Sequence, residues 1–191
     1  YYNRVRNMQK AAQKIEEEYA GKFPENYEEI KALPGIGNYT AGAISSFAYG
    51  IPKPAVDGNV LRVVSRLLAS DADIMKASVR TKIENAIEPV IPEDAASDFN
   101  QGLIELGAIV CVPNGEAKCE ICPLTGICEA KRLGIQNELP VKKKAKARRI
   151  EERTVLIFKD GDHVAIRKRP DKGLLAGMYE FPNLDGKLTM D

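Results

Sequence analysis

The chain has 191 residues, of which 44% are hydrophobic and 29% are charged, and its formal net charge is +1 at pH 7. These values are typical of a globular protein with one or two domains and a proper core. The small net charge excludes a global basic field, so any polyanion must be bound by a local surface. No apolar run reaches the length of a membrane span, and we expect no signal peptide.

Helical periodicity runs through the first two thirds of the chain. Apolar residues recur at helical spacing from Asn3 to Tyr19, and Gly21 is suited to end this helix. Asn26 predicts the N-cap of a short helix over 27–32. Further helices are predicted over 38–49, 76–88, 93–110 and 123–133. The first part of the chain is therefore predicted to be mainly α.

A glycine-containing turn joins two of these predicted helices. Its Gly-x-Gly pattern exposes backbone N–H groups at a helix start, which forms a concavity that suits a phosphate. We therefore predict contact with a nucleic-acid backbone, although Gly35 and Gly37 could also do no more than close a turn between helices. The residues of the predicted contact are Leu33, Pro34, Gly35, Ile36, Gly37, Tyr39 and Thr40.

An aspartate follows this turn at a short distance. Asp57 lies where Asp-Gly-Asn opens the apolar run that begins at Val60, a position that predicts a helix N-cap. The helix dipole favours a negative charge there, which suits a group that faces a developing positive charge. The simpler alternative is that Asp57 only caps the helix.

These two motifs together resemble the helix-hairpin-helix DNA glycosylases, in which an L-P-G-(I/V)-G hairpin grips DNA and an Asp follows in a V-D motif. Tyr39 and the sequence Asp57-Gly58-Asn59 are similar to the MutY-type adenine DNA glycosylases. In the endonuclease III branch, a Lys stands at the position of Tyr39, and Thr-His follows the Asp. An endonuclease III-like pyrimidine glycosylase and lyase is thus an alternative that Tyr39 opposes.

The resemblance implies an N-glycosyl hydrolase that flips adenine out of double-stranded DNA, where it lies opposite 8-oxoguanine or guanine, and removes it. Asp57 would stabilise the cationic sugar. Tyr39 would help to place Asp57 or stabilise the sugar, and Asn59 would orient Asp57. Because Tyr39 offers no amine for a Schiff base, lyase activity should be absent or weak. The implied setting is base-excision repair, inside the cell and in the cytoplasm or nucleoid if the source is bacterial.

The segment 98–107, with the sequence Asp-Phe-Asn-Gln-Gly-Leu-Ile-Glu-Leu-Gly, resembles the family's F-N-Q-x-(L/M)-x-(E/D)-L-G-A helix. The resemblance places Gln101 in the adenine pocket, where its amide would hydrogen-bond the extruded base. Glu105 lies one turn further on the same helix face and joins it as a predicted substrate-binding residue. The alternative for Gln101 is a solvated side chain on a helix surface.

Four cysteines fall within one short loop, at Cys111, Cys119, Cys122 and Cys128. Such clustering in a chain without secretory signals indicates metal ligation rather than disulfides, and four thiolates suit either a 4Fe–4S cluster or a structural zinc. The resemblance favours the iron–sulfur cluster, which the family holds on a C-x6-C-x2-C-x5-C loop. The first gap here is seven residues, one longer than that pattern.

The last part of the chain has a different character. Proline and the basic run 142–149 predict an extended linker over 135–152, and strands are predicted over 154–158 and 163–167 around a turn at 160–162. Residues 168–182 resemble the opening of the Nudix-like domain with which these glycosylases read 8-oxoguanine. The predicted domains are a helix-hairpin-helix glycosylase domain over 1–134 that contains the cysteine loop 111–128, the linker, and the N-terminal part of a Nudix-like α+β domain over 153–191.

Because the chain starts without Met inside a helical pattern and stops abruptly, we expect a fragment. In the family a base-protonating Glu lies well upstream of the hairpin, so we expect this piece to cleave adenine poorly or not at all. We expect a monomer with no membrane partner. Outside enzymology, the alternative is a helix-hairpin-helix DNA-binding module without catalytic activity.

Overall fold

The computed structural model describes residues 2–143 and 147–188. The chain divides into two compact units, over Asn3–Lys144 and Ala145–Asp191. This division falls within the segment 135–152 that the sequence predicts to be a linker, while the domain bounds themselves stay predictions. Residues 144–146 of the basic run and 189–191 of the second predicted domain lie outside the described residues.

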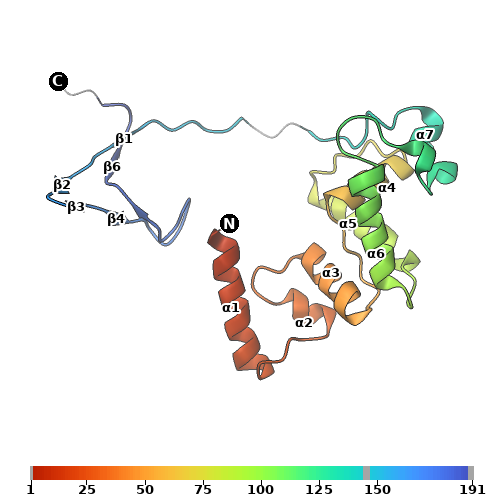
Figure 1. Cartoon of the computed structure of the whole chain (residues 1–191), viewed down its shortest axis with the longest axis horizontal. Coiled ribbons are helices and arrows are strands. Elements are labelled where there is room, and N and C mark those ends of the chain that lie inside the picture. The colour runs from red at the N-terminus through yellow and green to blue at the C-terminus, as the bar shows by residue number, and fades with distance from the viewer. Residues whose placement is uncertain (1, 144–146, 189–191) are drawn as a thin grey trace. The chain divides into compact units, whose positions relative to one another are not determined.

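The first unit is helical, as predicted, and Figure 1 shows its helices along the chain. Its α-helices are α1 (Tyr2–Tyr19), α2 (Tyr27–Lys31), α3 (Asn38–Tyr49), α4 (Gly58–Leu67), α5 (Ala77–Ile87), α6 (Ala96–Glu105) and α7 (Glu129–Leu133). Four short helical turns accompany them, namely η1 (Glu88–Val90), η2 (Leu106–Val110), η3 (Cys119–Ile121) and η4 (Thr125–Ile127). Among these, η2 is a π-helical turn and the other three are 3-10 turns.

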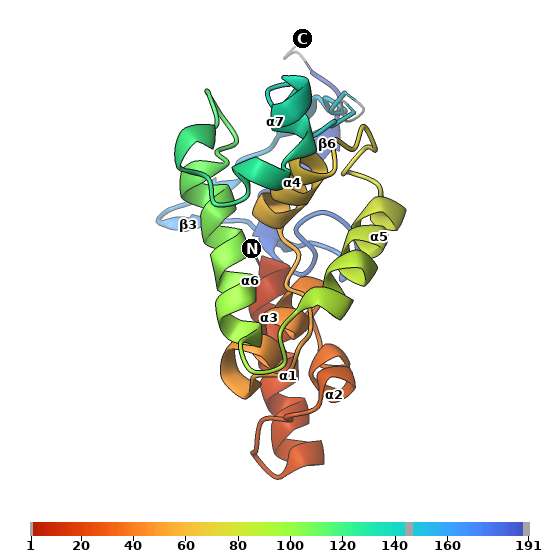
Figure 2. The same ribbon diagram turned by 90° about the vertical axis from the view of Figure 1, so that its right-hand side faces the viewer.

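The core of this unit surrounds α4, in which every residue from Val60 to Arg66 is buried. Figure 2 shows α4 between α5 and α6, and both helices contact it. The buried members of the apolar cluster are Val56, Val60, Leu61, Val64, Ile74, Ile83, Ile87, Ile91 and Ala96. Because α4 is covered on all sides, its first residue and the preceding Asp57 are held on a rigid support.

The helix ends follow the local sequence in most places. Gly50 takes the left-handed conformation, with φ of 65°, and ends α3 at the predicted residue. Asn26 caps α2 as predicted, and its side chain accepts from the N–H of Glu28.

Two predicted helices differ from the structure. The helix expected over 93–110 begins only at Ala96, because Pro92 and Ala95 form a turn in which the Ala95 N–H donates to the Pro92 carbonyl. The helix expected over 123–133 is broken at Cys128, whose extended backbone separates η4 from α7. The tertiary fold of the cysteine loop overrides helix propensity at this point.

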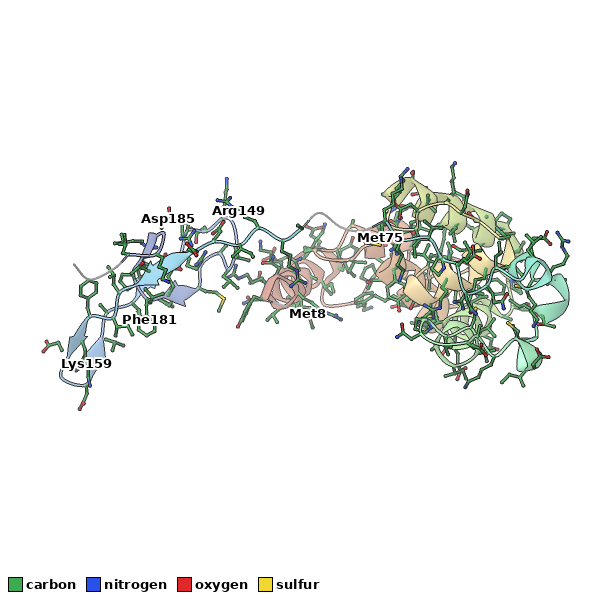
Figure 3. The ribbon with its side chains drawn as sticks, turned by 90° about the horizontal axis from the view of Figure 1, so that it is seen from above. Met8, Met75, Arg149, Lys159, Phe181 and Asp185 are labelled. Carbon is green, nitrogen blue, oxygen red and sulfur yellow. The ribbon has the colours of Figure 1, made fainter. Side chains whose placement is uncertain are left out.

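The second unit consists of short antiparallel pairs. Strand β1 (Arg153–Val155) pairs with β6 (Asn183–Asp185), β2 (Lys159–Asp160) pairs with β3 (His163–Val164), and β4 (Arg167–Lys168) pairs with β5 (Tyr179–Glu180). The predicted hairpin is present only next to its turn, where Lys159, labelled in Figure 3, faces Val164. Residues 153–155 pair with the distant 183–185, a long-range register that local periodicity does not reveal.

None of the helices in the described ranges is long and apolar enough to cross a membrane.

Candidate functional site

The hairpin turn is fixed by close packing against α1. Gly35 has φ of +82°, and a Cβ there would lie 2.6 Å from the Cβ of Asn7, so glycine satisfies both the backbone and the space. Leu33 is 2% exposed and anchors the turn in the interior. Gly37 precedes α3 as an N-cap with no side-chain hydrogen bond. The first N–H groups of α3 are therefore left without a side-chain cap, as an anion-binding helix start requires.

Tyr39 and Thr40 lie exposed in the first turn of α3, just beyond this uncapped start. Tyr39 also lines a groove of about 790 Å³ between α1 and the hairpin. Apolar side chains dominate the walls, among them Met8, which Figure 3 labels on α1. The full set of lining residues is Arg4, Asn7, Met8, Ala11, Ala12, Ile15, Phe23, Leu33, Pro34, Gly35, Ile36, Tyr39, Thr40 and Ile44.

Asp57 is the N-cap of α4, as the sequence predicts. Its Oδ1 accepts from the N–H groups of Asn59, at 2.8 Å, and Val60, at 2.9 Å. Its Oδ2 accepts from Nδ2 of Asn59 at 2.9 Å, and the side chain is half-buried. Both carboxylate oxygens are thus oriented by fixed donors, which keeps the group in one rotamer beside solvent.

The segment that leads to Asp57 is held by a buried asparagine that the sequence analysis did not single out. Asn100 on α6 is 2% exposed, and its Oδ1 accepts from the N–H of Ala55 at 2.8 Å. Its Nδ2 donates to the carbonyls of Lys53 and Ala96, each at 3.0 Å. The signal was the Asn that directly precedes Gln101 in the Phe-Asn-Gln motif.

The backbone of the same segment also lies very close to α3. A Cβ on Gly42 of α3 would lie 2.0 Å from the carbonyl oxygen of Pro54. Only glycine allows this approach, so α3 and the segment before Asp57 touch through their backbones. The hairpin helix and the aspartate are therefore coupled mechanically through residues 54–57.

A buried arginine links Asn59 to the loop of cysteines. Arg62 is 4% exposed, and its Nη2 donates to Oδ1 of Asn59 at 2.9 Å and to the carbonyl of Gly107 at 2.6 Å. Its Nε donates to the carbonyl of Cys111 at 2.7 Å. Burial, followed by the neighbouring guanidinium of Arg66, lowers the pKa of Arg62, while Asp57 and Cys111 act in the opposite direction.

Gly107 belongs to the π-helical turn η2, and this turn brings its backbone against Asn59. A Cβ on Gly107 would lie 2.6 Å from the Cβ of Asn59. Arg62 lies five residues after Asp57 in an apolar helix, followed four residues later by Arg66. Two arginines at this spacing within a buried run were the sequence signal for these contacts, because buried charges must be paired or hydrogen-bonded.

All four cysteines line one small cavity between α4 and the loop that follows η2. Arg66, 4% exposed, donates from Nη1 to the Sγ of Cys111 at 3.2 Å, and Lys118 and Lys131 also line the cavity. Burial raises the pKa of the Cys119 thiol, and the ammonium of Lys131 opposes that shift. Cations beside four thiols fit a bound group that carries negative charge on sulfur.

The four thiols do not form a preformed site for a metal ion. Within the described residues, no three Cys, His, Asp or Glu side chains are grouped so that they could hold a metal ion. Four thiolates about 2.3 Å from one zinc would have to lie within about 4 Å of each other. The four cysteines surround a common cavity.

The two predicted substrate-binding residues lie on the exposed side of α6. Gln101 is exposed, and its Nε2 donates to Oγ of Ser97 at 2.8 Å. Glu105 is also exposed, at the last residue of α6. Their role toward a base stays a prediction, since the structure assigns Gln101 a partner on its own helix.

Comparisons with known proteins agree with this geometry. A family described as "Helix-hairpin-helix motif" matches residues 18–47, which contain α2, the turn and most of α3. The chain is 33% identical to an adenine DNA glycosylase of Schizosaccharomyces pombe, over 97% of this chain and 49% of that protein. It is 31% identical to the adenine DNA glycosylase of Homo sapiens, over 96% of this chain and 42% of that protein. The chain therefore spans about half the length of the curated relatives it matches.

Solved structures of two further DNA glycosylases resemble the fold. A thermostable thymine-DNA glycosylase matches with a TM-score of 0.59 and 28% identity, over 68% of this chain and 58% of that chain. An endonuclease III trapped as a covalent intermediate with DNA matches with a TM-score of 0.58 and 31% identity, over 70% of this chain and 60% of that chain.

Proposed function

Since this chain belongs to the MutY-type family of helix-hairpin-helix DNA glycosylases, we propose that it forms the DNA-gripping and catalytic-aspartate part of an adenine DNA glycosylase. The observation that carries the proposal is the placement of Asp57. Its carboxylate is oriented by three N–H donors, and its backbone is tied through residues 54–57 to the helix that starts at the hairpin. The substrate is double-stranded DNA with adenine opposite 8-oxoguanine or guanine.

The chemistry follows from the charge that develops as the glycosidic bond breaks. The bond between adenine N9 and the sugar C1′ breaks, its electron pair leaves with the base, and C1′ acquires oxocarbenium character that water then quenches. A fixed carboxylate stabilises this cation without reorganising. Asp57 has that role, Asn59 orients it, and Tyr39 flanks the sugar. We assign the proton for the departing base to the upstream Glu that the family resemblance implies.

Tyr39 separates this function from that of endonuclease III. A lyase needs an amine that attacks C1′ and forms a Schiff base, and α3 contains no lysine. Borohydride treatment of the chain with a duplex that contains an abasic site should therefore trap no covalent adduct. A trapped adduct would favour the pyrimidine glycosylase and lyase.

The central test measures adenine release under single-turnover conditions from duplexes with adenine opposite 8-oxoguanine, guanine or thymine. The chain is assayed alone and joined to any residues that its gene encodes before Tyr1, and the longer form is expected to carry the activity. Asp57→Asn keeps an oxygen that can cap α4, so it should preserve folding and duplex binding and lower cleavage by at least about a hundredfold. Asp94→Asn, at an exposed carboxylate, is the matched control and should cleave like the parent. Equal loss of binding and cleavage in Asp57→Asn would refute the assigned role.

We assign the cysteine cavity to a 4Fe–4S cluster, with a structural zinc as the alternative. When bound, the cluster would link the parts of the loop 111–128 to one another through four thiolates. Its role would be structural, because a closed four-thiolate site leaves no open position for catalysis. Cys111, Cys119, Cys122 and Cys128 would hold it, and Arg66 would donate to the first sulfur. Anaerobically purified protein should contain about four irons per chain and absorb in the visible range. Colourless protein with one zinc would overturn the assignment.

This function places the protein at the chromosome, inside the cell, and we propose that it acts there as a monomer. Sedimentation of the chain with and without a short duplex tests the monomer. Duplex binding without base release, in both the short and the extended form, would instead support a DNA-binding module without chemistry.

A further inference from the structure

A row of three ionisable side chains on α5 and η1 reaches into the region that carries the hairpin and Asp57. Arg80, Glu84 and Glu88 are spaced four residues apart, so they lie along one face. Nη1 of Arg80 donates to the carbonyl of Val56, the residue before Asp57, at 2.9 Å. The first member of the row therefore holds the backbone of the residue before the aspartate.

The other two members of the row reach the hairpin and the connecting segment. Oε2 of Glu84 accepts from Nδ2 of Asn38 at 2.9 Å, and Asn38 is the first residue of α3. Oε1 of Glu88 pairs with Nζ of Lys53 at 2.5 Å. One helix face thus holds the start of α3 and both ends of the segment 53–56.

Stability alone does not account for Glu84. Its side chain is 8% exposed, and its Oε1 has no hydrogen-bond partner in the part of the chain that the structure describes. A buried carboxylate that keeps one oxygen unpaired is costly, and an apolar side chain of similar volume would fill the site with less desolvation. Its neighbours Ile83 and Ile87 already supply the apolar contacts of α5 with the core.

Charge does not account for it either. A carboxylate within hydrogen-bonding distance of the residue that begins α3 lies close to the predicted phosphate contact, where a negative charge opposes DNA binding. What the carboxylate does provide is a fixed acceptor, which holds the side chain of Asn38 in one orientation at the helix start.

We propose that α5 is a positioning strut that sets the hairpin loop and Asp57 relative to each other, with Glu84 as its central positioning residue. Glu84 holds Asn38 and thereby the start of α3. Arg80 holds the backbone of Val56, next to Asp57, and Glu88 holds Lys53 at the other end of the segment 53–56. All three act through other protein groups. The proposal rests on the proposed function for the role of the hairpin, whereas the strut itself is a property of the free protein.

The test compares Glu84→Leu with Glu84→Gln. Electrostatics alone requires that both neutral variants bind duplex DNA more tightly than the parent. Positioning requires opposite signs, because Gln keeps an acceptor for Asn38 and Leu removes it. We expect Glu84→Leu to bind a duplex about five- to tenfold more weakly in fluorescence anisotropy and Glu84→Gln to bind at least as tightly as the parent. Asn85→Ala, at an exposed position of α5, is the matched control and should change nothing.

A double-mutant cycle with Asn38→Ala isolates the contact. If Glu84 acts through Asn38, the double variant Asn38→Ala and Glu84→Leu binds DNA no more weakly than the weaker single variant. Additive losses would overturn the proposal, as would tighter binding by Glu84→Leu.

Hydrogen exchange in the free chain tests the strut without DNA. Glu84→Leu should speed exchange at the amides that follow the hairpin, including Ala41, whose N–H donates to the Gly37 carbonyl. Amides in the middle of α4 and the unfolding midpoint should stay as in the parent. Uniformly faster exchange would show a merely structural role and refute positioning. If the parent chain fails to bind any duplex, the proposed function fails, while the exchange result still decides the strut.

Discussion

Replacement of Gly42 by alanine tests the backbone contact between the hairpin helix and the segment that leads to Asp57. The new Cβ would lie 2.0 Å from the Pro54 oxygen and 2.8 Å from its carbon. To restore a contact of 3.4 Å, α3 and the segment must separate by about 1.4 Å. Such overpacking costs about 1–3 kcal/mol, and weakening of the hydrogen bond from the Ala55 N–H to Asn100 adds about 0.5–1.5 kcal/mol.

The intrinsic helix propensity of alanine acts in the opposite direction by up to about 1 kcal/mol. The net expectation for Gly42→Ala is a loss of about 0.5–3.5 kcal/mol, which lowers the melting temperature of the helical unit by about 2–12 °C. Gly102→Ala is the matched control, because Gly102 is also within an α-helix and a Cβ there meets nothing within 4 Å. It should raise stability by about 0.5–1 kcal/mol.

The assay is thermal and urea unfolding followed by circular dichroism at the helical band, together with duplex binding. Opposite signs for the two glycine variants are expected, and Gly42→Ala should also weaken the coupling between hairpin and aspartate. An equal rise in melting temperature for both variants would refute the reasoning, since it would mean that the segment before Asp57 moves away at no cost.

Three further outcomes follow from buried or paired side chains. Asn100→Leu should lower the unfolding free energy by about 2–4 kcal/mol in urea titrations, because it removes the side-chain partner of the Ala55 N–H and of the Lys53 and Ala96 carbonyls. Gln101→Leu, at the exposed neighbouring position, should stay within about 0.5 kcal/mol of the parent. The hydrogen bond and charge of Glu88 raise the pKa of Lys53 above its ordinary 10.5, so this pair stabilises the fold below pH 10.5 and its contribution disappears as the pH rises through the raised pKa. The Tm difference between the parent and Glu88→Gln should therefore shrink in that pH range. A constant Tm difference would contradict this expectation. Arg66→Met removes the donors to Cys111 Sγ and to two carbonyls, so we expect a loss of about 2–4 kcal/mol in denaturant unfolding, while a neutral result would show that these contacts are not needed.

Local sequence patterns were enough for the elements that depend on nearest neighbours. Gly50 ends α3 because a left-handed residue favours glycine, and Asp57 caps α4 because its short side chain reaches the N–H groups two and three residues ahead. These interactions lie within a few residues, so the periodicity and the caps predicted the helices of the hairpin and the start of α4.

Local sequence patterns do not reveal interactions between distant segments. Asn100 and Ala55 lie 45 residues apart, and Glu84 and Asn38 lie 46 residues apart. The same polar residue on a helix is solvated in one fold and buried in another, so the choice between Asn100 and its exposed neighbour Gln101 could not be made from spacing. The break at Cys128 also depends on the loop as a whole rather than on the helix propensity around it.

The sequence by itself determined the helices, the uncapped turn and the aspartate at a helix start, because each depends on backbone geometry and side-chain reach over a few residues. Only the tertiary structure decided how these parts are held in place. Gly42, Asn100 and two members of the row on α5, Arg80 and Glu88, converge on residues 53–56, because the polar groups of that segment need partners that only the packed fold brings near.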